Sequence, residues 1–147
     1  MNALAPSAVQ QQCQENPAAQ YIDVRTVAEF AEGRPLLRAV NIPFVFHTPH
    51  GGAEVPNGSF VEIIGFLFPT DAHLILGAGA DDRAERAADA LRAAGFVSVS
   101  VMAGGMGAWR AALLPTTRDN RDGVSYVSLL TRFRRKDKAA TGSPAAH

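Results

Sequence analysis

The sequence predicts a single α/β domain in which a central, mostly parallel β-sheet is covered by helices on both faces. Short apolar segments that favour β-strands alternate along the chain with segments that favour helices, and this alternation is typical of parallel sheets. The chain has 147 residues, of which 47% are hydrophobic, so it is long and apolar enough for one sizeable core. We find no internal repeat that would divide it into smaller units.

The first third of the chain predicts two strands with a short helix between them. Residues 21–24 are apolar and β-prone, so we expect a buried strand there. Thr26 can cap a helix whose Glu29 returns a hydrogen bond three residues on, and Gly33 would end that helix. Residues 39–43 predict a second short strand that is closed by its proline.

The middle of the chain predicts a loop, a helix and a central strand. Residues 47–58 are rich in Pro and Gly and should form a loop. Ser59 and Glu62 have the spacing of a capping box, which would open an apolar helix that ends at Pro69. Residues 74–76 are fully apolar and bounded by turn residues, as expected of a central strand.

The last third predicts a helix over residues 85–96, a strand over 97–101 and a short helix over 106–112. We expect the domain to cover residues 1–128. The tail, residues 129–147, is basic at first and then small and polar, so we expect it to be partly disordered.

Composition argues against several classes of partner. Lys and Arg total 14, as do Asp and Glu, so charge gives no reason to expect nucleic acid or an anionic membrane. No apolar run is long enough to cross a bilayer, and the N-terminus lacks the features of a signal peptide. Cys13 is the single cysteine, so an internal disulfide is impossible and a cytoplasmic protein is expected.

The segment after the 74–76 strand is the expected working site, because open parallel sheets bind their ligands beyond the carboxyl ends of the strands. It consists of Gly77, Ala78, Gly79, Ala80, Asp81, Asp82, Arg83 and Ala84. A loop of small residues that leads into a helix can point several backbone N–H groups at one anion.

Several motifs in order make the chain similar to the rhodanese superfamily. These are YIDVRTVAEF, AVNIP, PNGSFVEIIGFLFP, LILG and LRAAGFVSVSVMAGGMGAWRAALLP, and the resemblance extends over roughly residues 8–117. The chain looks closest to the small single-domain thiosulfate sulfurtransferases. The resemblance implies a rhodanese-like fold and a loop whose cysteine carries sulfur as a persulfide.

The loop departs from that family pattern. The family has a cysteine, two residues, a glycine, one residue, an arginine and a Ser or Thr, so the resemblance places Ala78 at the cysteine, Asp81 at the glycine and Ala84 at the Ser or Thr. Arg83 alone is retained. An alanine has no atom that can attack sulfur. Because the other positions differ as well, we interpret Ala78 as a natural difference rather than a single designed substitution.

The remaining loop residues have structural interpretations. Asp81 and Asp82 would repel thiosulfate or a persulfide, and they can also cap the following helix. Asp23 and Arg25 match family positions, and the resemblance implies that Asp23 organises the loop through a charged hydrogen bond to Arg83.

We therefore expect a rhodanese-homology domain that is inactive in sulfur transfer and acts as a binding or regulatory module. Its partner would be a protein or a small ligand at the 77–83 loop and the flanking 44–58 segment. The alternative is a sulfurtransferase-related enzyme that uses another thiol, such as Cys13 or a ligand thiol. Hydrolytic chemistry is disfavoured because it would need the same missing cysteine.

Other polar residues of the sequence have ordinary structural interpretations. Cys13 has no basic neighbour in sequence to activate it and should be an ordinary thiol on an N-terminal helix. His47 and His50 lack a third ligand at a firm spacing, so we expect neither a metal nor another cofactor. His73 should be a polar residue at a strand start, and Arg34 stands where the family often has His.

Two surfaces could still meet a partner. The aromatic and apolar residues of the middle segment should be mostly core, and any exposed ones would contact a partner or a second copy in a homodimer. They are Phe44, Phe46, Phe60, Ile64, Phe66 and Phe68. The basic tail is most simply a solvated charge run. It contains Arg132, Arg134, Arg135, Lys136 and Lys138.

Overall fold

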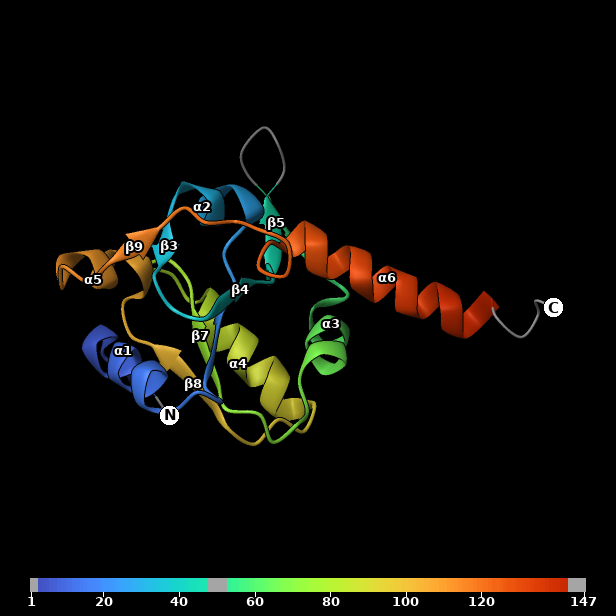
Figure 1. Ribbon diagram of the computed structural model, residues 1–147, viewed down its shortest axis with the longest axis horizontal. Helices are drawn as coiled ribbons and strands as arrows, with labels where there is room; N and C mark the ends of the chain where they lie inside the picture. The colour runs from blue at the N-terminus through green and yellow to red at the C-terminus, as the bar shows by residue number, and fades with distance from the viewer. Residues whose placement is uncertain (1–2, 48–52, 143–147) are drawn as a thin grey trace.

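The computed structural model describes residues 3–47 and 53–142, and it has the predicted three-layer architecture with a parallel sheet between helices (Figure 1). Five strands form the central sheet, and each neighbouring pair runs parallel. In spatial order they are β1 (Ala3–Leu4), β8 (Val99–Met102), β7 (Leu74–Gly77), β2 (Gln20–Asp23) and β4 (Ala39–Asn41). The predicted fold class is confirmed.

Helices cover both faces of this sheet, as Figure 1 shows. One face carries α1 (Pro6–Glu15) and α5 (Gly105–Ala111). The other carries α3 (Phe60–Leu67), α4 (Arg83–Ala93) and α6 (Tyr126–Gly142). The short helix α2 (Val27–Glu32) follows β2. Two antiparallel pairs complete the fold: β3 (Arg34–Pro35) with β9 (Thr116–Thr117), and β5 (Val45–His47) with β6 (Glu54–Pro56).

Side chains of the central strands alternate between two apolar clusters. Ile22 and Leu76 pack against α3, α4 and α6, whereas Tyr21 and Ile75 pack against α1 and α5. All four are at most 1% exposed. Burying a side chain of this size contributes about 1.5–3 kcal/mol, and a register shift of one residue would exchange the two faces. The core therefore fixes where the chain leaves β2 and β7, and with it the position of the loops that follow.

Most element ends agree with the local signals. Thr26 and Glu29 form the expected capping box, and Gly33 follows the last residue of α2. The second expected capping box is wrong, because the Ser59 side chain does not cap α3. Instead, Asn57 Oδ1 accepts the Ser59 N–H at 3.1 Å.

Two strand boundaries also differ from expectation. Residues 54–56, expected as loop, pair with β5 as β6. The strand expected from residue 97 begins at Val99, and Val97 is exposed. The pairing partners of β6 and β8 decide these boundaries, and a single sequence does not reveal them.

The C-terminal segment continues the domain. The boundary expected between residues 128 and 129 falls inside α6, and Leu129 is buried in the larger apolar cluster. The Phe133 ring packs on Phe66 of α3 with 5.8 Å between centroids. In the part of the chain that the structure describes, no helix is long and apolar enough to cross a membrane.

Candidate functional site

The loop of residues 77–83 joins β7 to α4 at the carboxyl edge of the sheet. Its start is fixed from two sides. The Gly77 carbonyl accepts the Val24 N–H at 2.9 Å, and the Ala78 carbonyl accepts the Met106 N–H at 2.8 Å. A Cβ at Gly77 would lie 1.7 Å from the Tyr21 hydroxyl oxygen, so only glycine fits there. The loop is therefore held by backbone contacts with the segments after β2 and β8.

The side chain of Ala78 lies in the apolar cluster shared with α3, α4 and α6 and is 2% exposed. A methyl group offers neither a hydrogen bond nor a nucleophile. Residues 80–82 form the exposed tip of the loop. The loop therefore presents polar groups only at its tip and at the start of α4.

Arg83 is the centre of the charged contacts at this site. Its Nη1 lies 2.7 Å from Glu29 Oε1 and its Nη2 lies 3.0 Å from Glu29 Oε2, which is a bidentate pair. Its Nε donates to both carboxylate oxygens of Asp81, at 2.9 and 3.1 Å. The Arg83 side chain is 3% exposed. Because two carboxylates surround this guanidinium, it stays charged, and its hydrogen bonds to Glu29 raise its pKa further.

Glu29 responds in the opposite direction. Partial burial of its carboxyl opposes ionisation, but hydrogen bonds from Arg83 and Thr26 outweigh that cost and lower its pKa from 4.5 to about 2. Sequence analysis assigned Glu29 only to the capping box. Glu29 serves both roles at once, because its Oε1 accepts the Thr26 N–H at 2.9 Å as well as Arg83 Nη1, and its Oε2 accepts Arg83 Nη2.

The expected pair of Asp23 with Arg83 is wrong. Asp23 instead pairs with Arg25, whose Nη2 lies 2.7 Å from Asp23 Oδ2. Both side chains are buried, and Arg25 also donates to the Gly33 carbonyl at 2.8 Å. Two residues of separation allow Arg25 to fold back onto the nearby carboxylate, so this pair fixes the turn from β2 into α2. Arg83 is left to Glu29.

The two aspartates of the loop have different roles. Asp81 Oδ1 accepts the Arg83 N–H at 3.2 Å, so Asp81 satisfies a free N–H at the start of α4, as expected. Asp82 occupies the N-cap position, but its side chain makes no capping bond. It accepts from Arg86 Nε at 3.0 Å instead.

Arg86 connects the loop to the β5–β6 hairpin. Its Nη2 lies 3.3 Å from Glu54 Oε2, and its guanidinium lies over the Phe44 ring, 5.5 Å from the centroid. We call Glu29, Glu54, Asp81 and Asp82 the acidic rim. The acidic rim has four carboxylates for the two guanidiniums of Arg83 and Arg86. This surface therefore carries net negative charge.

A cavity of about 360 Å³ adjoins the acidic rim between the start of α2 and β5. It is lined by Thr26, Val27, Ala28, Phe46 and His47. Of the two histidines considered as weak metal ligands, the structure describes only His47, because His50 lies outside the described residues. Within residues 3–47 and 53–142, no three His, Cys, Asp or Glu side chains gather where they could hold a metal ion.

Three other residues considered in the sequence lie away from the loop. Cys13 is buried on α1 against the opposite face of the sheet, and burial raises the pKa of its thiol. His73, at the amino end of β7, lies 3.0 Å from Ser98 Oγ and 3.1 Å from Gln12 Oε1. Arg34 is buried beside β9 and donates to backbone carbonyls. None of them contributes a side chain to the loop.

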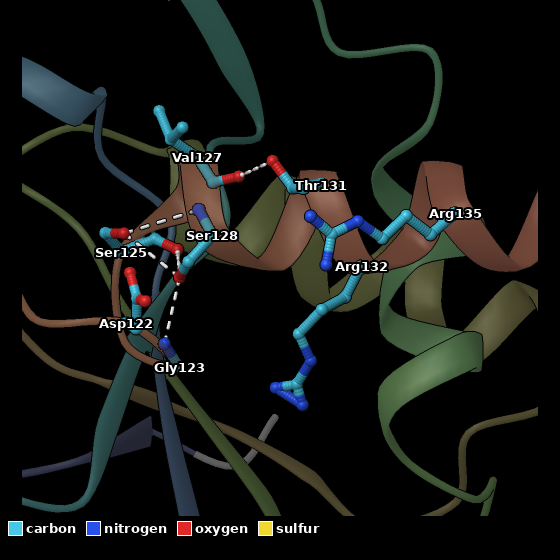
Figure 2. A pocket seen from close by; sticks show the side chains of 8 residues that line it. All are labelled: Asp122, Gly123, Ser125, Val127, Ser128, Thr131, Arg132 and Arg135. Carbon is cyan, nitrogen blue, oxygen red and sulfur yellow. Dashed lines mark hydrogen bonds between the residues drawn. The ribbon is translucent and has the colours of Figure 1, made fainter.

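A further cavity, of about 490 Å³, lies along the start of α6 rather than at the loop. Figure 2 shows Arg132 and Arg135 extending from the helix beside it, while the hydroxyls of Ser125 and Ser128 bond to each other and to the backbone. Those hydroxyls close the turn that starts α6, which gives them a structural role.

Comparison with known proteins now decides the family. The family model for the rhodanese-like domain matches residues 5–112. The chain belongs to the rhodanese-like domain family. The resemblance seen in the sequence is thereby confirmed, and the match ends within the turn after α5, so α6 lies outside it.

Relatives of this rhodanese-like domain include plant proteins. The chain is 35% identical over 95 residues to rhodanese-like domain-containing protein 15, chloroplastic, of Arabidopsis thaliana, covering 65% of this chain and 50% of the relative. The Senescence-associated protein DIN1 of Raphanus sativus is also 35% identical over 95 residues, with the same coverage. The chain thus spans about half the length of these curated relatives.

Solved structures share the fold. The Alr3790 protein from Anabaena sp. superposes with a TM-score of 0.65 at 20% identity and covers 93% of each chain. The thiosulfate sulfurtransferase from Pseudomonas aeruginosa gives a TM-score of 0.63 at 18% identity, over 84% of this chain and 20% of that one. At these identities the likeness establishes the fold of the domain and leaves its chemistry to its own residues.

Proposed function

We propose that this rhodanese-like domain is a pseudoenzyme, inactive in sulfur transfer, that acts as a binding or regulatory module. The observation that carries the proposal is the chemistry of residue 78. The family loop holds its nucleophile after the central strand, and here Ala78 occupies that place with a buried methyl group. Covalent sulfur transfer needs a thiolate at this point.

The charges around the loop support the same proposal. Arg83, the one retained family residue, has its guanidinium occupied by Glu29 and Asp81 and is 3% exposed. It is therefore not free to bind thiosulfate. The acidic rim would repel a sulfur-donor anion, since like charges a few ångströms apart near a surface oppose each other by about 1 kcal/mol or more.

Cys13 is a poor substitute nucleophile. It lies in the apolar cluster of α1 and α5, across the sheet from the Ala78 side chain. Burial raises the pKa of its thiol, so the thiolate that would attack sulfur is disfavoured. The enzyme alternative is thereby reduced to a thiol brought by a ligand.

The acidic rim also indicates a partner. Glu54 and Asp82 are both exposed, and Glu54 pairs across the hairpin with His47, which lines the mostly apolar cavity between α2 and β5. Complementary charge favours a basic segment of another protein at this surface, with the cavity receiving an apolar side chain. We propose such a protein partner, with a second copy of the chain as the alternative, and a cytoplasmic location.

The first experiment measures thiosulfate:cyanide sulfur transfer by the purified protein. We expect no turnover above a heat-killed control, and the same result for Cys13→Ser. Turnover by the wild type that survives repeated gel filtration would refute the inactive assignment. Its loss in Cys13→Ser would then identify that thiol as the nucleophile.

The second experiment tests the binding surface with a hexalysine peptide, followed by backbone amide NMR. We expect salt-sensitive shifts in residues 80–86 that weaken in the Glu54→Gln/Asp82→Asn variant. Asp71→Asn, which removes an exposed carboxylate before β7, is the matched control and should bind like the wild type. Equal binding by all three proteins would exclude the acidic rim. Gel filtration of the same samples reports whether a second copy is bound instead.

A further inference from the structure

A third cavity lies beside β4, an edge strand of the sheet, and no residue of the 77–83 loop lines it. It has a volume of about 320 Å³, which is at the lower end of the range for small-ligand sites. Its lining comes from the start of β2 at Gln20, from the chain that leads into β4, and from residues 119–124. Three arginines from these segments reach it, namely Arg34, Arg38 and Arg121. We call this the arginine cavity.

Arg34 is the unusual member of the set because its charge is buried without a carboxylate partner. It is 5% exposed, and its Nε and Nη1 donate to the backbone carbonyls of Asp119, Pro35 and Leu37 at 3.0 to 3.1 Å. In the described part of the chain it forms no ion pair. By contrast, the other buried arginines, Arg25 and Arg83, each have a carboxylate within 3 Å.

Burial of this charge disfavours the protonated form of Arg34. Burial lowers the pKa of its guanidinium, and the carboxylates of Asp119 and Asp23 compensate in part from a longer distance. Within residues 3–47 and 53–142, Nη2 of Arg34 has no hydrogen-bond partner, and Arg34 lines the arginine cavity. A buried cation normally requires a counter-charge, and an open donor beside a cavity is where an anion would supply it.

The other two arginines, Arg38 and Arg121, add positive charge to the cavity, and its lining has too few carboxylates to balance that charge. Arg38 is exposed and donates through Nη1 to the Ala19 carbonyl at 2.6 Å. Asp119 is the single carboxylate among the lining residues, and it is engaged by Arg121 Nε at 3.0 Å. Three guanidiniums face one carboxylate, so the arginine cavity carries net positive charge.

We propose that the arginine cavity binds a tetrahedral oxyanion of the phosphate class, either free phosphate or the terminal phosphoryl group of a larger ligand. Planar guanidiniums suit this ligand because they donate two parallel hydrogen bonds to its oxygens. Arg34 is held rigid by three carbonyls, so it supplies a fixed donor, and Arg38 and Arg121 close around the anion from the surface. The site is independent of the loop and of the function proposed for it.

The test is a titration with inorganic phosphate against chloride at equal ionic strength, followed by backbone amide NMR and thermal unfolding. We expect saturable shifts at Ala39, Gly123 and Val124, with the amides of residues 77–83 unmoved, and a rise in Tm that grows with phosphate. Arg38→Gln and Arg121→Gln should each weaken binding roughly tenfold, the usual loss for one charge-assisted hydrogen bond.

Control variants distinguish phosphate binding at this cavity from non-specific attraction of phosphate to exposed arginines. Arg118→Gln removes an exposed arginine of the same segment that does not line the cavity, and it should bind like the wild type. Absence of saturation, equal binding by the Arg38→Gln/Arg121→Gln double variant, or shifts confined to residues 125–132 beside Arg132 would each overturn the proposal. Glycerol phosphate distinguishes the sources. Binding as tight as that of phosphate indicates a phosphoryl group on a larger ligand, and weaker binding indicates free phosphate.

Discussion

Arg83 at the start of α4 and Glu29 on α2 form a bidentate ion pair, with nitrogen to oxygen distances of 2.7 and 3.0 Å across 54 residues of sequence. The pair joins the loop after β7 to the helix after β2. Because Arg83 also holds Asp81, one buried guanidinium fixes the loop, the start of α4 and α2 relative to one another. Arg83 thus has a structural role in this chain.

Replacing Glu29 with Gln should destabilise the fold by about 2 kcal/mol. Breaking a fully buried pair costs about 3–5 kcal/mol, but the Glu29 side chain is 35% exposed and Asp81 remains beside Arg83, so we expect less. Urea unfolding measures the difference. Glu32→Gln, on the exposed face of the same helix, is the matched control and should stay within about 0.5 kcal/mol of the wild type. Equal stability of both variants would mean that the pair contributes nothing.

The same pair predicts how stability depends on pH. The pKa of Glu29 is lowered from 4.5 in the unfolded chain to about 2 in the folded one, so its contribution is complete above pH 4.5 and is lost as pH falls towards 2. The full shift corresponds to about 3 kcal/mol, and solvent screening reduces it to about 2. Between pH 2 and 5, the unfolding free energy should rise less steeply with pH for Glu29→Gln than for the wild type. A parallel pH profile for the two proteins would contradict this assignment.

If the proposed function is right, a cysteine at residue 78 should not be enough to give sulfur transfer. Ala78→Cys supplies the nucleophile but leaves the Asp81 carboxylate where a thiosulfate anion would approach, and Arg83 remains occupied. We expect near-background thiosulfate:cyanide turnover for Ala78→Cys and measurable turnover for Ala78→Cys/Asp81→Gly/Ala84→Ser. Ala80→Cys places a thiol at the exposed loop tip and serves as the matched control. If the single variant equals the triple one, the Asp81 carboxylate does not limit sulfur transfer at this loop.

Gly105 at the start of α5 should not tolerate a side chain. A Cβ there would lie 2.1 Å from the Gly79 carbonyl oxygen and 2.4 Å from that of Ala78, and its φ is +62°. Gly105→Ala should therefore cost about 3 kcal/mol and displace the loop. Gly107→Ala, two residues further along the same helix, meets open space and should stabilise by about 1 kcal/mol. Thermal unfolding of the two variants measures the difference in stability. A similar Tm for both would mean that the close backbone contact at Gly105 is not important.

The sequence alone determined the features that depend on neighbouring residues. The apolar run Leu74-Ile75-Leu76 predicts the central strand, and Thr26 with Glu29 predicts the start of α2, because β-propensity and capping operate over a few residues. The order of motifs gave the family and the position of Ala78 in the loop. The capping signal failed at Ser59, whose hydroxyl does not cap the helix and whose N–H bonds to the Asn57 side chain. Asn57 is itself held by Pro43 and Tyr126, which are distant in sequence.

Only the tertiary structure decided which charges meet and which segments are buried. Sequence reasoning joined Asp23 to Arg83, but Arg25 is nearer to Asp23 and folds back on it, which leaves Arg83 to Glu29. It likewise placed Leu129 in a tail, although α3 provides the apolar surface that buries it. The unpaired charge of Arg34 appears only when β3, β9 and β4 are assembled, because burial and Coulomb interactions depend on distance in space rather than along the chain.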